Sequence, residues 1–139
     1  MTMTPAAELI QVVLSEFQRT LQRNLEAYRG STSGAAPRRG YVEQTEYPEN
    51  AHEAGKPIAA WFVSPDAVQL SSIKEPRSPK IDGMFYDMLI GWFYFTNDLA
   101  AVHINWQIGP RYGRGFRHRI GRDTLGGYLL DRGTGIGIS

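Results

Sequence analysis

The sequence predicts a single α+β domain in which a long N-terminal amphipathic helix packs on an antiparallel β-sheet built around a central hairpin. Apolar residues recur at helical spacing over residues 4–29, and two strand-like stretches, 84–96 and 99–108, flank a short turn. At 139 residues the chain has the length of one domain. We expect one domain over 1–139, with a helix at 4–29, an extended loop or arm at 30–57, an antiparallel sheet region at 58–130 and a glycine-rich tail at 131–139.

Composition narrows the class of protein. The hydrophobic fraction of 42% and the aromatic fraction of 12% are typical of a globular fold. The sequence contains no cysteine, which excludes disulfides, thiolate metal sites and cysteine nucleophiles. The N-terminal residues do not resemble a secretory signal, and the longest apolar run is too short to cross a bilayer as a helix. We therefore expect a soluble cytoplasmic protein, or one assembled into a particle in the cytoplasm, with no membrane partner.

The helix has signals at both ends. Thr4 suits the N-cap, Pro5 suits the first helical position, and Gly30 suits the residue that follows the last turn. Asn24 lies on the apolar face, where it would help to set register if the helix also met a partner chain. This expected face holds Ala7, Ile10, Leu14, Phe17, Leu21, Asn24 and Tyr28.

Residues 30–57 show no helical or strand period and are rich in Gly, Pro, Ser and Glu. An unstructured loop of this length is uncommon inside a compact domain unless it has a function. We therefore expect an extended arm. Residues 58–63 predict a short strand, whereas 66–75 fit either a helix or a strand.

The strongest strand signal surrounds Asn97 and Asp98. A two-residue turn there would form a hairpin in which Phe93 faces Val102. One face of this hairpin is then apolar and is expected in the core. It holds Phe85, Leu89, Gly91, Phe93, Phe95, Ala100, Val102, Ile104, Trp106 and Ile108.

The opposite face of the hairpin is also partly apolar. It carries Met88, Trp92 and Tyr94, which should not face water, so the helix, the arm or another subunit should cover them. We assign these three residues to an interface. The second strand adds polar groups to the same face, and these are candidate ligand-binding residues: His103, Asn105 and Gln107.

Catalytic and metal-binding patterns are weak. The histidines His52, His103 and His118 lack metal-ligand spacing, and the glycines in 131–139 are not followed by the lysine and helix of a phosphate-binding loop. We predict no catalytic residue, no metal site and no cofactor.

Residues 111–122, "RYGRGFRHRIGR", are the most basic stretch. Within 115–120, apolar residues and His118 alternate with Arg117 and Arg119, which predicts a strand with these two arginines facing outward. Arg111 and Arg114 are expected in the preceding turn, and Arg122 after the strand. Three interpretations compete: a charged edge strand, an interface with a neighbouring subunit, and a phosphate-binding surface.

Charge is unevenly distributed along the chain. Residues 101–139 contain six arginines and two aspartates, a net charge of +4, whereas residues 1–100 contain nine basic and twelve acidic residues, a net charge of −3. Complementary charge favours self-association. The first hypothesis is therefore a non-enzymatic subunit that forms a homo-oligomer or docks with other protein subunits, as in a virus-like particle. The alternatives are a nucleic-acid-binding protein that uses Arg111 to Arg122, and a small enzyme or ligand-binding domain that uses Trp92, His103 and Asn105.

Overall fold

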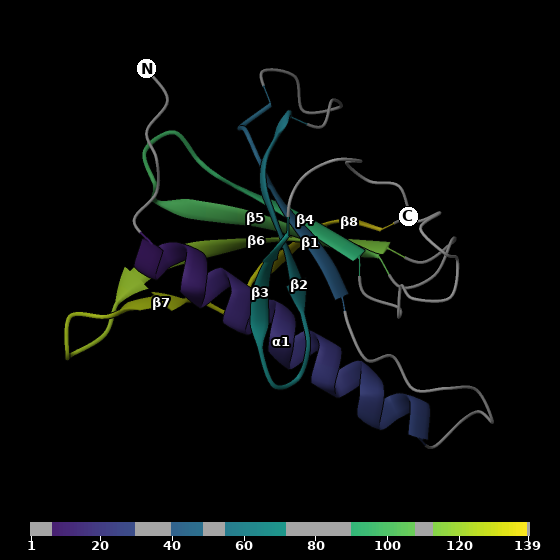
Figure 1. Ribbon diagram of the computed structural model, residues 1–139. Helices are drawn as coiled ribbons and strands as arrows, with labels where there is room; N and C mark the ends of the chain where they lie inside the picture. Colours follow the sequence, from purple (N-terminus) through teal and green to yellow (C-terminus); the bar gives the residue numbers. More distant parts are fainter. Residues whose placement is uncertain (1–6, 30–39, 49–54, 72–89, 108–112, 139) are drawn as a thin grey trace.

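The computed structural model describes residues 7–29, 40–48, 55–71, 90–107 and 113–138. Over these ranges the chain is α+β, with one helix lying across one face of a mixed eight-stranded sheet (Figure 1). The elements are α1 (Ala7–Arg29), β1 (Gly40–Thr45), β2 (Pro57–Val63), β3 (Val68–Ser71), β4 (Ile90–Phe95), β5 (Ala101–Gln107), β6 (Gly113–Arg122), β7 (Tyr128–Leu130) and β8 (Thr134–Ile138).

The strand order is β3-β2-β1-β4-β5-β6-β7, and β8 also pairs with β6. Every pair is antiparallel except β1 with β4, which is parallel. The expectation of a purely antiparallel sheet is therefore wrong. The β2–β3 hairpin occupies one edge of β1, and the chain returns to the other edge of β1 in the same direction, which makes the β1–β4 pair parallel.

The described part of the predicted helix is confirmed. Leu14, Phe17 and Leu21 are buried as expected, and Ile10 is partly buried. Ala7 is exposed, so the face that meets the sheet is turned away from the predicted stripe at the start of the helix. The predicted N-cap at Thr4 lies outside the described residues.

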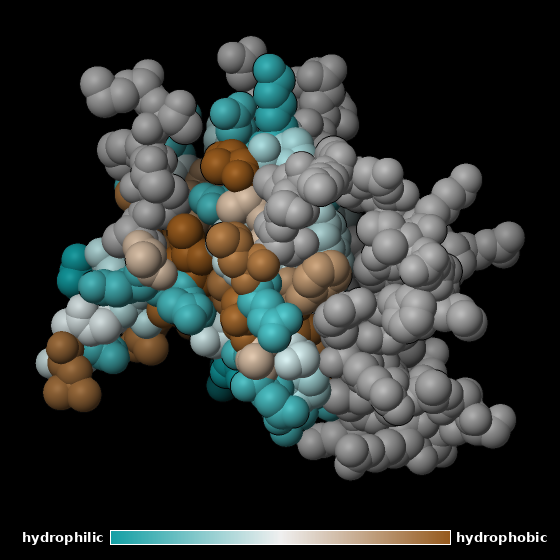
Figure 2. Space-filling model, in the orientation of Figure 1, coloured by the Kyte–Doolittle hydropathy of each residue, from teal (hydrophilic) through white to brown (hydrophobic). Residues whose placement is uncertain are grey.

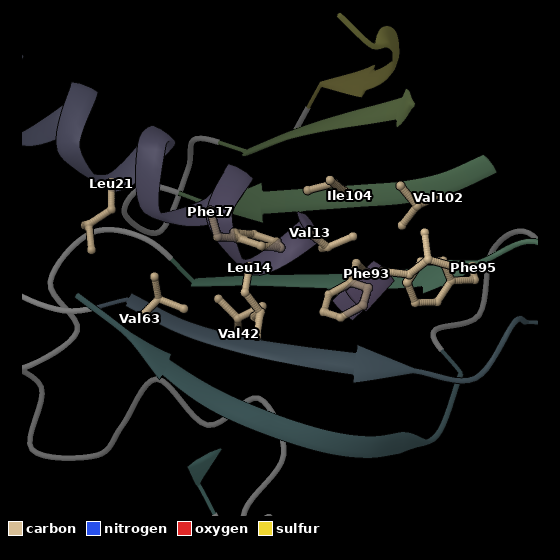
Figure 3. Packing of buried hydrophobic residues seen from close by; sticks show 11 residues of the cluster. Val13, Leu14, Phe17, Leu21, Val42, Val63, Phe93, Phe95, Val102 and Ile104 are labelled. Carbon is tan, nitrogen blue, oxygen red and sulfur yellow. The ribbon is translucent and has the colours of Figure 1, made fainter. Parts of the chain in front are cut away.

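The core forms where α1 crosses β1, β4 and β5 (Figure 3). The ring of Phe93 lies 6.2 Å from that of Phe17, 6.0 Å from that of Trp61 and 5.7 Å from that of Phe95, measured between centroids. Gly91 permits this approach, because a Cβ atom there would overlap Cε1 of Phe17. The absence of a side chain at Gly91 of β4 therefore allows α1 to pack this closely on the sheet.

Residues 40–45 correct the expectation of an unstructured arm. They form β1, lie between β2 and β4, and are buried throughout. The strand was not apparent because Glu43 and Gln44 interrupt its apolar pattern, although they are 1% and 5% exposed. A strand paired on both edges satisfies its backbone polar groups in the interior whatever its side chains. Residues 30–39 and 49–54 lie outside the described part.

The hairpin of β4 and β5 has a different register from the one expected. Phe93 faces Ile104 instead of Val102, because residues 97–100 form a four-residue connection. Thr96 N–H donates to the carbonyl of Ala101 at 2.9 Å, and the side chain of Asp98 accepts from the backbone N–H of Ala100 at 3.1 Å. The shift is two residues, so each side chain keeps its predicted face.

The C-terminal segment is a second correction. Residues 134–138 were expected in a glycine-rich tail, but they form β8 and pair with β6. β6 therefore has β5 on one side and β7 and β8 on the other, and the interpretation of β6 as a charged edge strand is wrong. Asp131 holds the connection between β7 and β8 against β6, since its Oδ1 accepts from the N–H groups of Arg119 at 3.1 Å and Gly133 at 2.8 Å.

Two exposed apolar residues lie on β2 and β3. Ile58 is 49% exposed and Leu70 is 77% exposed. The surface drawn in Figure 2 accordingly has apolar side chains beside α1, where β2 and β3 lie. No helix in the described ranges is long and apolar enough to cross a membrane.

Candidate functional site

A cleft of about 610 Å³ opens between α1 and the β5–β6–β7 end of the sheet. It differs from the site expected from the sequence, which lay on the opposite face of β4 and β5. The cleft is the candidate site because its volume falls within the roughly 300–1,000 Å³ typical of small-molecule pockets.

The floor of the cleft is apolar and aromatic. Phe17 of α1 and Ile104 of β5 are buried at its base, and Trp106 and Phe116 are partly buried above them. The rings of Trp106 and Phe116 are nearly parallel, with 16° between their planes and 6.2 Å between their centroids. Because Ile104 pairs with Phe116 across two neighbouring strands, the sheet itself fixes this floor.

The rim of the cleft carries four arginines. Arg19 and Arg23 lie one turn apart on α1, Arg114 lies on β6 and Arg132 follows β7; all four are exposed. Arg19 forms an ion pair with Glu16, which also lines the cleft. With Asp131 as the other carboxylate in the lining, arginine predominates, and the electrostatic potential favours anions.

His118 forms part of the wall and is only 6% exposed. Its Nδ1 lies 2.9 Å from the carbonyl oxygen of Asp131. A carbonyl oxygen only accepts, so Nδ1 carries the proton and donates it. Gly133 packs against the ring, since a Cβ there would lie 2.7 Å from Cε1 of His118. These contacts hold the imidazole in place.

The pKa of the Asp131 carboxyl is lowered from its ordinary value. The main cause is the hydrogen bond from the N–H of Gly133; partial desolvation opposes it, and the N–H of Arg119 and the charges of His118 and Arg119 add to the lowering. The ionised carboxylate therefore stabilises the turn that holds the His118 wall.

The predicted arginine cluster is divided by the structure. Arg114 has its side chain on the cleft side of the sheet, whereas Arg117 and Arg119 alternate to the opposite face. Arg114 also lies inside β6, not in the preceding turn as expected. Arg122 is the last residue of β6 and belongs to the β6–β7 hairpin, and Arg111 lies outside the described residues.

The contacts of Arg122 are local. Its guanidinium donates to the carbonyl of Gly126 at 3.2 Å and to the hydroxyl of Tyr128 at 3.0 Å, and it lies 4.5 Å from the centre of the Tyr128 ring. These contacts brace the hairpin that leads to β7.

The predicted polar and aromatic face also exists, on the side of the sheet away from α1. Tyr94 and His103 are stacked, with ring centroids 4.6 Å apart and 10° between the planes. Burial, and then the charge of the cross-strand neighbour Arg117, lowers the pKa of His103. Burial, and then Tyr47, raises the pKa of Tyr94. Burial and the Arg117 charge therefore both favour the neutral form of His103 in this aromatic stack.

The other residues predicted on this face lie along the same strands. Trp92 is the cross-strand partner of Asn105, and both are partly buried. Gln107 lies at the end of β5 opposite Gly113 of β6. Met88 lies outside the described residues. The structure thus brings Trp92, Tyr94, His103 and Asn105 to one face together with Arg117.

Sequence reasoning missed the cleft because its parts are distant in the chain. Arg19 and Arg23 come from the helix, Trp106 from β5 and Arg132 from the loop after β7. One signal was present: Arg19 and Arg23 are four residues apart, and this spacing places them on one side of a helix.

Within the described ranges, no group of three or more histidine, aspartate or glutamate residues is placed to hold a metal ion. Comparison of the chain with protein-family models, with curated proteins and with solved structures gave no match.

Proposed function

We propose that this chain is a non-enzymatic binding domain that holds a small organic molecule in the cleft between α1 and β5–β6–β7. The single observation that carries the proposal is the combination of a stacked aromatic floor with an arginine rim around about 610 Å³ of open space. Aromatic and apolar lining combined with convergent polar groups is usual in small-molecule sites, and in this cleft the polar groups supply the larger share of the lining surface.

The floor supports binding without rearrangement. Trp106 and Phe116 belong to adjacent strands whose register is fixed by the β5–β6 ladder, and Phe17 and Ile104 close the space beneath them. A ligand that covers the floor removes aromatic surface from water. Little conformational entropy is lost on binding, because the side chains of the floor are already ordered.

We assign binding and not catalysis to this cleft. His118 is the titratable side chain nearest to a catalytic type, but it is buried, it donates Nδ1–H to Asp131, and it is backed by Gly133. These contacts support a packing role in the wall.

The test is a fragment screen on the full chain by ¹H–¹⁵N NMR, using flat ring compounds. We expect shift changes at the indole N–H of Trp106 and in β6. We expect Trp106→Leu to weaken binding at least about fivefold, since loss of one aromatic stack is worth about 1–3 kcal/mol. Trp92→Leu is the matched control, because Trp92 is a partly buried tryptophan on the opposite face. Shift changes centred on Trp92 would move the site to the other side of the sheet and reject the proposal.

A second candidate is self-association of the subunit. The observation that favours it is Leu70, which is 77% exposed on β3, the last strand at one end of the described sheet order. Such strand edges pair readily with a second copy. Leu70→Asp should then convert an oligomer to a monomer in light scattering coupled to size exclusion; an unchanged mass would remove β3 from the interface.

A further inference from the structure

We infer that the ligand of the cleft is a flat apolar ring system carrying an anionic group, either a carboxylate or a phosphate. This inference rests on the proposed function and adds the chemical class of the ligand. The ring would lie on Trp106 and Phe116, and the anion would lie at the arginine rim.

The ring requirement follows from the shape of the floor. The planes of Trp106 and Phe116 differ by 16° and the ring centres are 6.2 Å apart, so the two rings are nearly parallel and stacked with each other. A flat ring of the ligand can extend this stack in the offset arrangement that aromatic groups prefer. Phe17 and Ile104 beneath these rings are 1% and 2% exposed. Their side chains have no polar atoms, so the base of the cleft is apolar at these two residues.

The anion requirement follows from the placement of charge. Arg114 is the cross-strand partner of Trp106, so one arginine emerges directly beside the aromatic floor. Arg23 approaches from α1, and Arg132 approaches from the loop after β7. The planar fork of an arginine suits both oxygens of a carboxylate or two oxygens of a phosphate.

The two carboxylates in the lining offset only part of this charge. Glu16 is engaged by Arg19 on the same helix. Oδ1 of Asp131 is engaged by the backbone N–H groups of Arg119 and Gly133. Asp131 keeps its negative charge in these hydrogen bonds, so four arginines face two carboxylates in the lining, an excess of two positive charges.

The probes are 2-naphthoate, its neutral analogue 2-naphthylmethanol, 2-naphthyl phosphate and inorganic phosphate, each titrated into the full chain and followed at the Trp106 indole. We expect 2-naphthoate and 2-naphthyl phosphate to bind at least about tenfold tighter than the alcohol, since a hydrogen bond to a charged group contributes about 1.5–3 kcal/mol. Inorganic phosphate should bind more weakly than its naphthyl ester, because it has no ring to stack.

Arg114→Gln should remove the preference for the acid over the alcohol, and Arg117→Gln should retain it. The two arginines are exposed and three residues apart on one strand, but they lie on opposite faces. If Arg114→Gln does not fold, as judged by circular dichroism, Arg132→Gln provides the same comparison and should reduce the preference.

The outcomes separate this inference from the proposed function. Equal affinity for the acid and the alcohol at the Trp106 site overturns the anionic class but leaves the cleft as a binding site. Equal affinity for inorganic phosphate and its naphthyl ester overturns the requirement for a ring. If no ring compound perturbs Trp106, in either this series or the fragment screen, the proposed function fails as well.

Discussion

Gly91→Ala should destabilise the fold because it forces apart α1 and β4. The added Cβ would overlap Cε1 of Phe17 and lie 2.9 Å from the carbonyl oxygen of Asn105. Phe17 is 1% exposed and packed against Phe93, so its ring has little room to retreat. Overpacking of this kind costs about 1–3 kcal/mol.

The net loss is smaller than the overlap alone implies. Alanine is preferred over glycine inside a regular element by roughly 0.5–1 kcal/mol, which offsets part of the strain. We therefore expect Gly91→Ala to lower the free energy of unfolding by about 1–2 kcal/mol. Phe17→Ala should lower it by about 3–5 kcal/mol, because the ring is fully buried.

The double variant tests the reasoning. When Phe17 is already alanine, the Cβ at residue 91 no longer meets a ring and only the contact with the Asn105 carbonyl remains. The combined loss should then be smaller than the sum of the single losses by about 1–2 kcal/mol, which is within the range measured for contacting residues.

Urea unfolding followed by far-ultraviolet circular dichroism supplies the four free energies of this cycle. Gly121→Ala on β6 is the control, since no atom lies within 4 Å of a Cβ there, and its effect should stay within about 0.5 kcal/mol. Additive losses, or equal losses for the two glycine variants, would refute the proposed limit on helix approach.

Three further predictions concern the C-terminal turn and the face away from α1. The pKa of Asp131 is lowered in the folded protein, so its carboxylate stabilises the fold at pH values above its ordinary pKa of about 3.9. This stability is lost as the pH falls through the lower folded pKa. Asp131→Asn should therefore flatten the fall in melting temperature between about pH 4.5 and 2.5. The NMR titration midpoint of His103 should lie below about 6.5 and should rise in Arg117→Gln, though only in part because burial is the larger cause; a midpoint at or above 6.5 contradicts this. Gly133→Ala should destabilise by about 1–3 kcal/mol in urea, since its φ is 77° and the new Cβ would meet the His118 ring.

The elements that the sequence predicted best are those whose pattern reports a single environment. β6 alternates because Phe116 and His118 face the cleft side while Arg117 and Arg119 face away. β2 is a short apolar run that ends before Pro65. In both strands the local pattern and the tertiary position agree.

β1 and β8 were missed because their environment depends on distant strands. β1 contains Glu43 and Gln44, yet both are buried between β2 and β4. β8 contains Gly135 and Gly137, which leave no alternation to detect, and it forms by pairing with β6. Local propensity carries little information when a strand is specified by its partners.

The geometry of β6 separates the interpretations of the basic stretch 111–122. β6 is paired along both edges, so it cannot rotate without breaking its ladders with β5, β7 and β8. Arg114 and Arg117 are therefore fixed on opposite faces, and one rigid ligand cannot contact both without crossing the sheet. A nucleic-acid surface built from the whole stretch would require β6 to rotate out of its ladders. A ligand in the cleft requires, of this stretch, only Arg114. Separate substitution of these two arginines thus reports which face of the sheet carries the function.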